Sequence, residues 1–310
     1  MALITTNNTW AGKDVNLFIN EAFTNALFYK NFAPKLIEAV NCKYIYFALE
    51  NSFNLQEYAC CPIDGFDDVT LDQRTGEVCN FMVIAKMCHQ DLACTARELN
   101  YRKGMRNQKI TDDAVLIDTI LSVALQQITT QLDDVIINGD TTYVGPGYLS
   151  ICDGLLVKFE ADPTVIDVVG AVVTPTNVIA ELNKIYDAIP DAIKFGTKAG
   201  QLKIAVSGNI ASAYMQALAT SGAFFAFNPT MNAPLTYLGI PLVTVTALPA
   251  NTAFATYSDN IILVTDDMVD WASMRIIDES LYSTCDQISM KLQARMAVDY
   301  GYGKYVVLYQ

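Results

Sequence analysis

The most regular pattern of apolar positions lies between Thr111 and Asn138. Thr111 is a suitable N-cap, and the acidic pair that follows it favours the positive end of a helix dipole. The pair Asn138-Gly139 is a common C-terminal stop. We therefore predict one helix over 111–138, about 40 Å long at 1.5 Å per residue. Its apolar face has the three- and four-residue spacing of a helix: Ile117, Ile120, Leu121, Ala124, Leu125, Ile128, Leu132, Val135 and Ile136.

Two different patterns precede this helix. Residues 15–40 have helical spacing interrupted near Pro34, which predicts a helical or partly mobile N-terminal arm within 1–45. From Cys42 onward, short apolar runs are separated by proline and glycine, and FDDVTL and EVCNFMVIA flank the segment DQRTG. This predicts a long hairpin over 46–85, with Gly76 at a turn position of positive φ.

After a turn-rich segment, TTYVGPGYLSICDGLL, residues 164–262 alternate between strand and helix patterns. VIDVVGAVV, QLKIAVSG, PLVTVTA and AFATYS predict strands, whereas TNVIAELNKIYDAIP, beginning at Pro175, and ASAYMQALA predict helices. Such alternation is typical of an α/β or α+β layer domain. The remaining residues to 310 read as antiparallel strands that need a distant partner, for which the face of the long helix is the obvious candidate.

Charge is distributed unevenly along the chain. The 310 residues have a formal net charge of −13 and a pI near 4.4, so we expect neither tight, sequence-independent nucleic-acid binding nor anchoring to acidic lipid. Residues 164–262 contain only five acidic and four basic residues, and 204–258 contain no charged residue or histidine. Obligate subunit interfaces are depleted of charge in this way. The alternative is an unusually apolar core with neutral loops.

Other features narrow the class of protein. No segment has about 18 uninterrupted apolar residues, and MALITTNNTWAGKD is too polar for a signal-peptide core, so we expect a cytoplasmic origin. The eight cysteines are too sparse for a disulfide scaffold and form no CxxC pair. We predict free, mostly buried thiols rather than disulfides or metal ligands.

The sequence offers little for catalysis. Its single histidine, His89, follows Cys88, and in a strand these two side chains would point to opposite faces. Zinc spacing and phosphate-binding glycine loops are missing. Three acidic pairs could bind Mg²⁺, but helix capping and solvation explain them more simply: Asp112/Asp113, Asp133/Asp134 and Asp266/Asp267. We predict no catalytic, cofactor or metal site.

Three segments together resemble one family. They are LDDVIINGDTTYVGPGYLSICDGLL (132–156), TYLGIPLVTVTALP (236–249) and MKLQARMAVDYGYGKYVVLY (290–309). With the order of the other parts, they resemble the major capsid proteins of tailed bacteriophages, which have the Hong Kong 97-like fold. The resemblance implies an α+β chain: an N-terminal arm (1–45), an extended loop (46–85), a peripheral domain with the spine helix (86–163), an axial domain (164–262) and return strands of the peripheral domain (263–310).

The resemblance also implies contacts between subunits. Asp72, Arg74 and Gly76 would lie at the tip of an extended loop that covers a neighbour. The axial domain would meet its copies around the fivefold and sixfold axes through Phe224, Phe225 and Phe227. Residues 51–85 contain no lysine, so we predict no isopeptide crosslink from this loop.

The expected function is self-assembly into the pentamers and hexamers of an icosahedral virion shell around double-stranded DNA, assembled in the host cytoplasm. Partners would be other copies, weakly held DNA, and scaffolding, portal and decoration proteins, with scaffolding either separate or absent and no membrane contact. Two alternatives stay open: an encapsulin-type compartment that encloses an enzyme, and an oligomeric cytoplasmic α/β enzyme.

Overall fold

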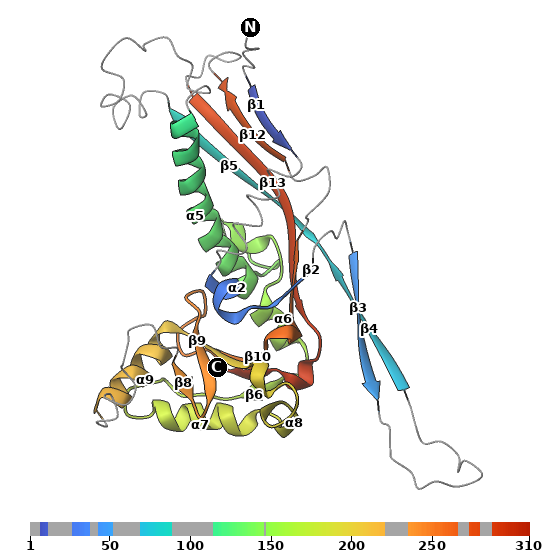
Figure 1. The fold of residues 1–310 in the computed structure, drawn as a ribbon, viewed down its shortest axis with the longest axis vertical. Helices are drawn as coiled ribbons and strands as arrows, with labels where there is room; N and C mark the ends of the chain where they lie inside the picture. The colour runs from blue at the N-terminus through green and yellow to red at the C-terminus, as the bar shows by residue number, and fades with distance from the viewer. Residues whose placement is uncertain are drawn as a thin grey trace, which may run out of the picture.

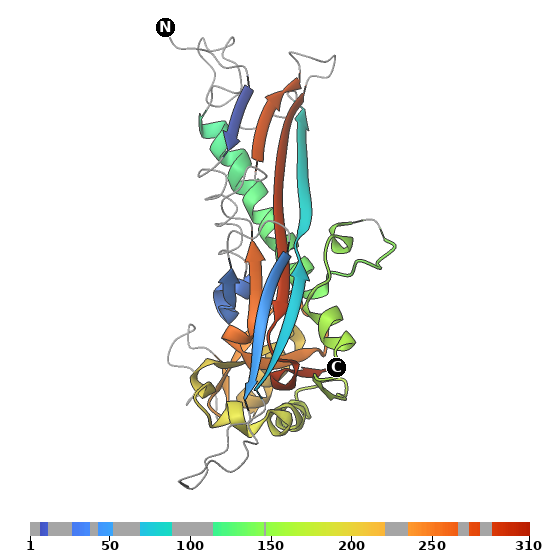
Figure 2. The same cartoon turned by 90° about the vertical axis from the view of Figure 1, so that its right-hand side faces the viewer.

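The computed structural model describes residues 7–11, 27–37, 43–51, 69–88, 114–145, 147–220, 235–265, 273–279 and 287–310. Most of the described strands form two six-stranded sheets. A long helix runs beside the sheet that contains β5 (Cys79–Cys88) and β13 (Gln287–Tyr300) (Figure 1). A separate two-stranded hairpin completes the strands. The molecule is elongated in both views (Figure 2). We call the two large sheets the stem sheet and the layer sheet.

The stem sheet is built around β13 (Gln287–Tyr300), the longest strand. β13 pairs antiparallel with β5 (Cys79–Cys88), β12 (Ser273–Asp278) and β11 (Ile261–Thr265). Two short strands extend it: β1 (Asn7–Ala11) pairs antiparallel with β12, and β2 (Lys35–Ile37) pairs parallel with β11. The predicted N-terminal arm therefore contributes strands as well as a short helix, α2 (Leu27–Phe32).

The long helix is present as α5 (Ala114–Asn138) and ends at the predicted residue. Residues 111–113, including the expected cap, lie outside the described residues. The buried side chains of Ile128, Leu132 and Val135 share a core with Phe81 of β5 and Met296 of β13. The expectation that the C-terminal strands pack on the long helix is confirmed, and their strand partner is β5.

The layer sheet has the strand order β6-β14-β10-β7-β9-β8. Helices α7 (Val178–Ala188) and α9 (Gly208–Thr220) cover one face, while α2 and α6 (Leu155–Ala161) pack on the other. Because both faces are covered, β10 is buried at all five positions. The six strands are β6 (Ile166–Val168), β14 (Val307–Tyr309), β10 (Ala253–Tyr257), β7 (Leu202–Val206), β9 (Ile240–Thr244) and β8 (Thr236–Tyr237).

Alternate residues of these strands enter different cores. Ala253 and Ala255 of β10 face α7 and α9, whereas Phe254 faces the core shared with the stem sheet. The ring of Phe254 lies 5.6 Å from the Phe32 ring of α2 and 5.6 Å from the Phe159 ring of α6. The two sheets are therefore joined through a continuous apolar core.

Several predicted elements have different bounds. The strand expected at 165–173 is only β6, because its partner β14 has three residues, and residues 169–177 form a loop instead. α7 begins three residues after Pro175. β14 joins the layer sheet rather than the stem sheet, unlike the expected grouping of 263–310. The short helices are α8 (Asp191–Lys194) and the 3₁₀ turns at Tyr148–Ser150, Ala199–Gln201, Ser258–Asn260 and Gly303–Tyr305.

A hairpin is present, but its turn is not where the sequence predicted it. β3 (Lys43–Asn51) and β4 (Val69–Glu77) pair antiparallel over all nine residues. The segment 72–76, expected at the tip, lies inside β4, and β5 leaves the hairpin to join the stem sheet. Gly76 is opposite Tyr44, and a methyl group at Gly76 would overlap the Tyr44 ring. The glycine is needed for this close approach, not for a turn.

The prediction of free thiols is wrong for two cysteines. Cys79, the first residue of β5, forms a disulfide with Cys152, which follows the turn after α5. Their Cα atoms are 5.9 Å apart, within the range that a disulfide spans, although 73 positions separate them in the sequence. Pairing over such a separation depends on the fold and leaves no spacing motif.

Candidate assembly surfaces

The base of the hairpin is fixed to the body by one buried tyrosine. The Tyr44 hydroxyl donates a hydrogen bond to Oδ2 of Asp299 on β13, at 2.8 Å. Burial and the neighbouring carboxylate raise the pKa of Tyr44 far above its usual value, so it stays a neutral donor. Asp299 also lies 3.8 Å from Nζ of Lys158, which donates to the Val298 carbonyl. Hairpin, stem sheet and α6 thus meet at Asp299.

Beyond its base, the hairpin has no third strand among the described residues. In Figure 1 it descends beside the layer sheet as a separate ribbon. Ile45 is half exposed, and the pair Lys43–Glu77, at 2.7 Å, is in solvent. Two-stranded hairpins are marginally stable in water unless a further strand or another surface covers them. The hairpin is therefore a candidate contact surface.

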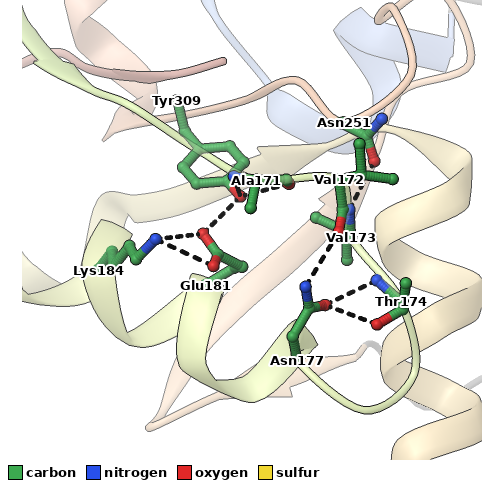
Figure 3. Close-up of polar contacts among 9 residues, drawn as sticks. All are labelled: Ala171, Val172, Val173, Thr174, Asn177, Glu181, Lys184, Asn251 and Tyr309. Carbon is green, nitrogen blue, oxygen red and sulfur yellow. Dashed lines mark hydrogen bonds and ion pairs between the residues drawn. The ribbon is translucent and has the colours of Figure 1, made fainter.

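A second surface is the loop 169–177 at the β6 edge of the layer sheet. Its backbone is held by the C-terminal end of the chain. The Gly170 N–H donates to the Gln310 carbonyl at 2.8 Å. The Ala171 N–H donates to the Tyr309 hydroxyl at 3.3 Å (Figure 3). The Tyr309 hydroxyl in turn donates to Oε2 of the buried Glu181 at 2.8 Å. Burial, with this carboxylate, raises the pKa of Tyr309 to about 12.

Glu181 has a second partner, since Nζ of Lys184 lies 2.8 Å from its Oε2. Hydrogen bonds from Lys184 and Tyr309 keep the pKa of the Glu181 carboxyl below its usual value despite burial. Because Tyr309 links Glu181 to the loop, this ionised group contributes to the position of Ala171 (Figure 3).

Two asparagines hold the rest of the loop. Asn177 donates from Nδ2 to the Val172 carbonyl at 3.0 Å, and Oδ1 of Asn251 accepts the Val173 N–H at 3.0 Å (Figure 3). The backbone is therefore fixed while two apolar side chains face solvent: Val169 is 84% exposed and Val172 73% exposed. The loop thus holds two exposed apolar side chains in a fixed position, which makes it a candidate contact surface.

The layer sheet exposes apolar side chains elsewhere as well. Phe195, after α8, is 75% exposed, and Leu238, in the turn between β8 and β9, is 62% exposed. β8 and β6 are the two edges of the layer sheet, so Leu238 and Val169 lie at opposite edges.

The contact residues predicted from the sequence do not lie where they were expected or lie outside the described residues. The backbones of Asp72 and Arg74 lie in β4, opposite Ala48 and Tyr46, so they are strand residues of the hairpin and not its tip. Phe224, Phe225 and Phe227 lie outside the described residues. Val169, Val172 and Leu238 were not singled out, since the apolar pattern around them predicts buried strands. The uncharged, glycine-containing run 168–180 is a signal in the sequence that favours the loop.

The acidic pair Asp133/Asp134 makes tertiary hydrogen bonds instead of the expected capping and solvation, and Asp133 is buried. Asp133 accepts the Phe28 N–H of α2 at 3.2 Å, and Asp134 accepts the Tyr148 hydroxyl at 2.8 Å. His89 and the pairs at 112–113 and 266–267 lie outside the described residues. Within the part that the structure describes, no three His, Cys, Asp or Glu side chains gather as metal ligands. Nor is any described helix both long and apolar enough to cross a membrane.

Comparison with solved structures shows which proteins have a similar fold. The chain superposes on a chain of the satellite phage P4 procapsid with a TM-score of 0.56 at 12% identity, covering 95% of this chain and 97% of that one. The chain has the fold of phage capsid proteins. For Gordonia phage Cozz the TM-score is 0.53 at 12% identity, covering 100% and 88% of the two chains. For a virus-like particle from Pyrococcus furiosus it is 0.54 at 9% identity, covering 96% and 99%.

At these identities the likeness is one of fold, and it extends from end to end of the chains. It supports the α+β capsid fold expected from the sequence. No protein-family model matches the sequence, and a search of curated proteins found no similar one.

Proposed function

We propose that the protein is a structural shell subunit: a major capsid protein that assembles into pentamers and hexamers of an icosahedral virion shell around double-stranded DNA. The observation that carries the proposal is the end-to-end likeness to a procapsid chain, which covers 95% of this chain and 97% of that one. Both sheets are included in a match of this extent. A catalytic role has no support in the described residues.

The hairpin supports this function independently. A nine-residue, two-stranded ribbon with no covering strand in the described part gains stability when it lies on another subunit. Asp72, Arg74 and Gly76 then belong to the strand that leads to this contact. In the shell, the Tyr44–Asp299 hydrogen bond holds the ribbon at its angle to the stem sheet.

The charge distribution fits the same role. Apart from β14, the strands of the layer sheet, with helices α7 and α9, come from residues 164–262, which contain nine charged residues among 99. Surfaces with few ions meet other subunits without the cost of removing unpaired charges from water. The net charge of −13 keeps contact with packaged DNA weak, so that the genome is enclosed rather than tightly bound. We propose scaffolding, portal and decoration proteins as further partners, and the virion as the location.

The experiment is light scattering of the purified protein after size exclusion, followed by nuclease digestion of any particles. The proposal predicts megadalton particles that hold nuclease-protected double-stranded DNA when they come from infected cells. A single discrete oligomer of a few subunits, with no larger particle under any assembly condition, would contradict it and favour an enzyme.

A second candidate is a shell that encloses protein cargo, as in an encapsulin-type compartment. The observation that keeps this candidate open is the likeness, with a TM-score of 0.54, to a particle from Pyrococcus furiosus that is described as virus-like. Particles of uniform size that contain a second protein and no protected DNA would establish this candidate instead.

A further inference from the structure

The turn between β8 and β9 contains a residue that does not suit its backbone. Tyr237 pairs with Ile240, so Leu238 and Gly239 form a two-residue hairpin loop. Both have positive φ, 46° for Leu238 and 86° for Gly239. This is the pattern of a type I′ turn, in which Asn-Gly or Asp-Gly is strongly preferred. A leucine at positive φ is strained because its Cβ crowds the backbone.

Leu238 is unfavourable in a second respect, since 62% of it is exposed while its neighbours Tyr237 and Ile240 are buried. Neither the backbone conformation nor the contacts within the subunit explain a large apolar side chain here. Strained positions of this kind persist where a function maintains them. An apolar side chain held outward in a tight turn is suited to insertion into another surface.

The matching surface is at the other edge of the layer sheet. Val169 and Val172 are exposed there on the loop whose backbone is held by Tyr309, Asn177 and Asn251. Both surfaces lie in uncharged sequence, because residues 168–180 and 235–252 contain no charged side chain. These two segments therefore bring no ion of their own into the contact.

We propose that Leu238 of one subunit packs against Val169 and Val172 of the next subunit in a ring. The inference rests on the proposed function and specifies its contact. A closed ring needs a head-to-tail interface between two different surfaces of the same chain. The β8 turn and the β6 loop satisfy this requirement because they lie at opposite edges of one rigid sheet. The partner is therefore a second copy.

The first test is Leu238→Asn, measured for both folding and assembly. Asn-Gly suits a type I′ turn, so the thermal midpoint of the unassembled subunit should stay the same or rise. The concentration needed for assembly should increase about tenfold, which corresponds to 1.4 kcal/mol per contact. Val144→Asn is the matched control, since Val144 is fully exposed in the turn after α5, outside both sheets. The control should assemble like the wild type.

The second test is a directed crosslink. Val172→Cys and Leu238→Cys are made separately, assembled from an equimolar mixture and mildly oxidised. The mixture should give covalent dimers above the wild-type background of native cysteines, whereas either variant alone should not, because the two positions meet only between different surfaces. The double variant should give a ladder up to the size of the ring.

The outcomes separate the contact from the function. If the wild type forms shells but Leu238→Asn assembles at the same concentration and the mixture gives no dimers, the contact is wrong and the shell function stands. Equal losses in Leu238→Asn and Val144→Asn would also overturn the contact, since any exposed apolar residue would then matter. If the wild type forms no shell under any condition, the proposed function itself fails.

Discussion

Removal of the disulfide between Cys79 and Cys152 should destabilise the subunit by a calculable amount. The bond closes a loop of 73 residues, which restricts the unfolded chain and corresponds to about 4 kcal/mol in the chain-entropy account. For a chain of 310 residues that unfolds cooperatively, this lowers the thermal midpoint by about 6 °C. Cys152→Ala, Cys79→Ala and the double variant should lose nearly the same amount, because either substitution removes the whole crosslink.

The assay is calorimetry of unassembled, oxidised subunits, with and without reductant. Reductant should lower the midpoint of the wild type and leave Cys152→Ala unchanged. Peptide mapping without reduction should find the Cys79 and Cys152 peptides joined. The reasoning is refuted if both thiols are alkylated before reduction, or if the effects of the two single variants add in the double variant.

Three further predictions concern the hydrogen bond of Tyr44 at the hairpin base, the core around Phe254 and the buried carboxylate of Glu181. Tyr44→Phe removes a hydrogen bond to a carboxylate worth about 1.5–3 kcal/mol, so hydrogen exchange in β3 and β4 should accelerate at least tenfold, whereas Tyr143→Phe, at an exposed site, should change nothing. Phe254→Ala should cost about 3–5 kcal/mol in urea unfolding, and a loss below about 1 kcal/mol would show that the two sheets do not share this core. The pKa of Glu181 is lower in the folded protein than in the unfolded chain, where it is about 4.3, so ionised Glu181 stabilises the fold at a pH above about 4.3. This stabilisation is lost as the pH falls through the pKa of Glu181 in the folded protein. The stability difference between wild type and Glu181→Gln should therefore be largest at pH 7 and shrink below about pH 4, and a difference independent of pH would contradict the assignment.

The elements that sequence predicted best are those whose pattern is local. The long helix was found because its apolar face repeats over many turns and ends at Asn138-Gly139. The strands and helices of residues 164–262 were found for the same reason, although β6 is shorter than its apolar run because β14 offers only three pairing residues. Order and spacing of short motifs then led to the fold family.

Most failures involve contacts between residues distant in sequence. Gly76 was interpreted as a turn glycine, yet its role comes from the Tyr44 ring that lies over it from the facing strand. The Cys79–Cys152 pair and the parallel pairing of β2 with β11 likewise have no local signature. Leu238 was overlooked for a local reason, because a hydropathy pattern reports neither the backbone conformation of a turn nor the exposure of its side chains.

The most direct test of the account is electron cryomicroscopy of the purified protein, alone and with scaffolding partners supplied. We predict closed shells in which the layer sheets meet in rings around fivefold and sixfold axes, and in which the β3–β4 hairpin lies on a neighbouring subunit. A protein that stays a 34.1 kDa monomer at high concentration, with those partners present, would contradict it.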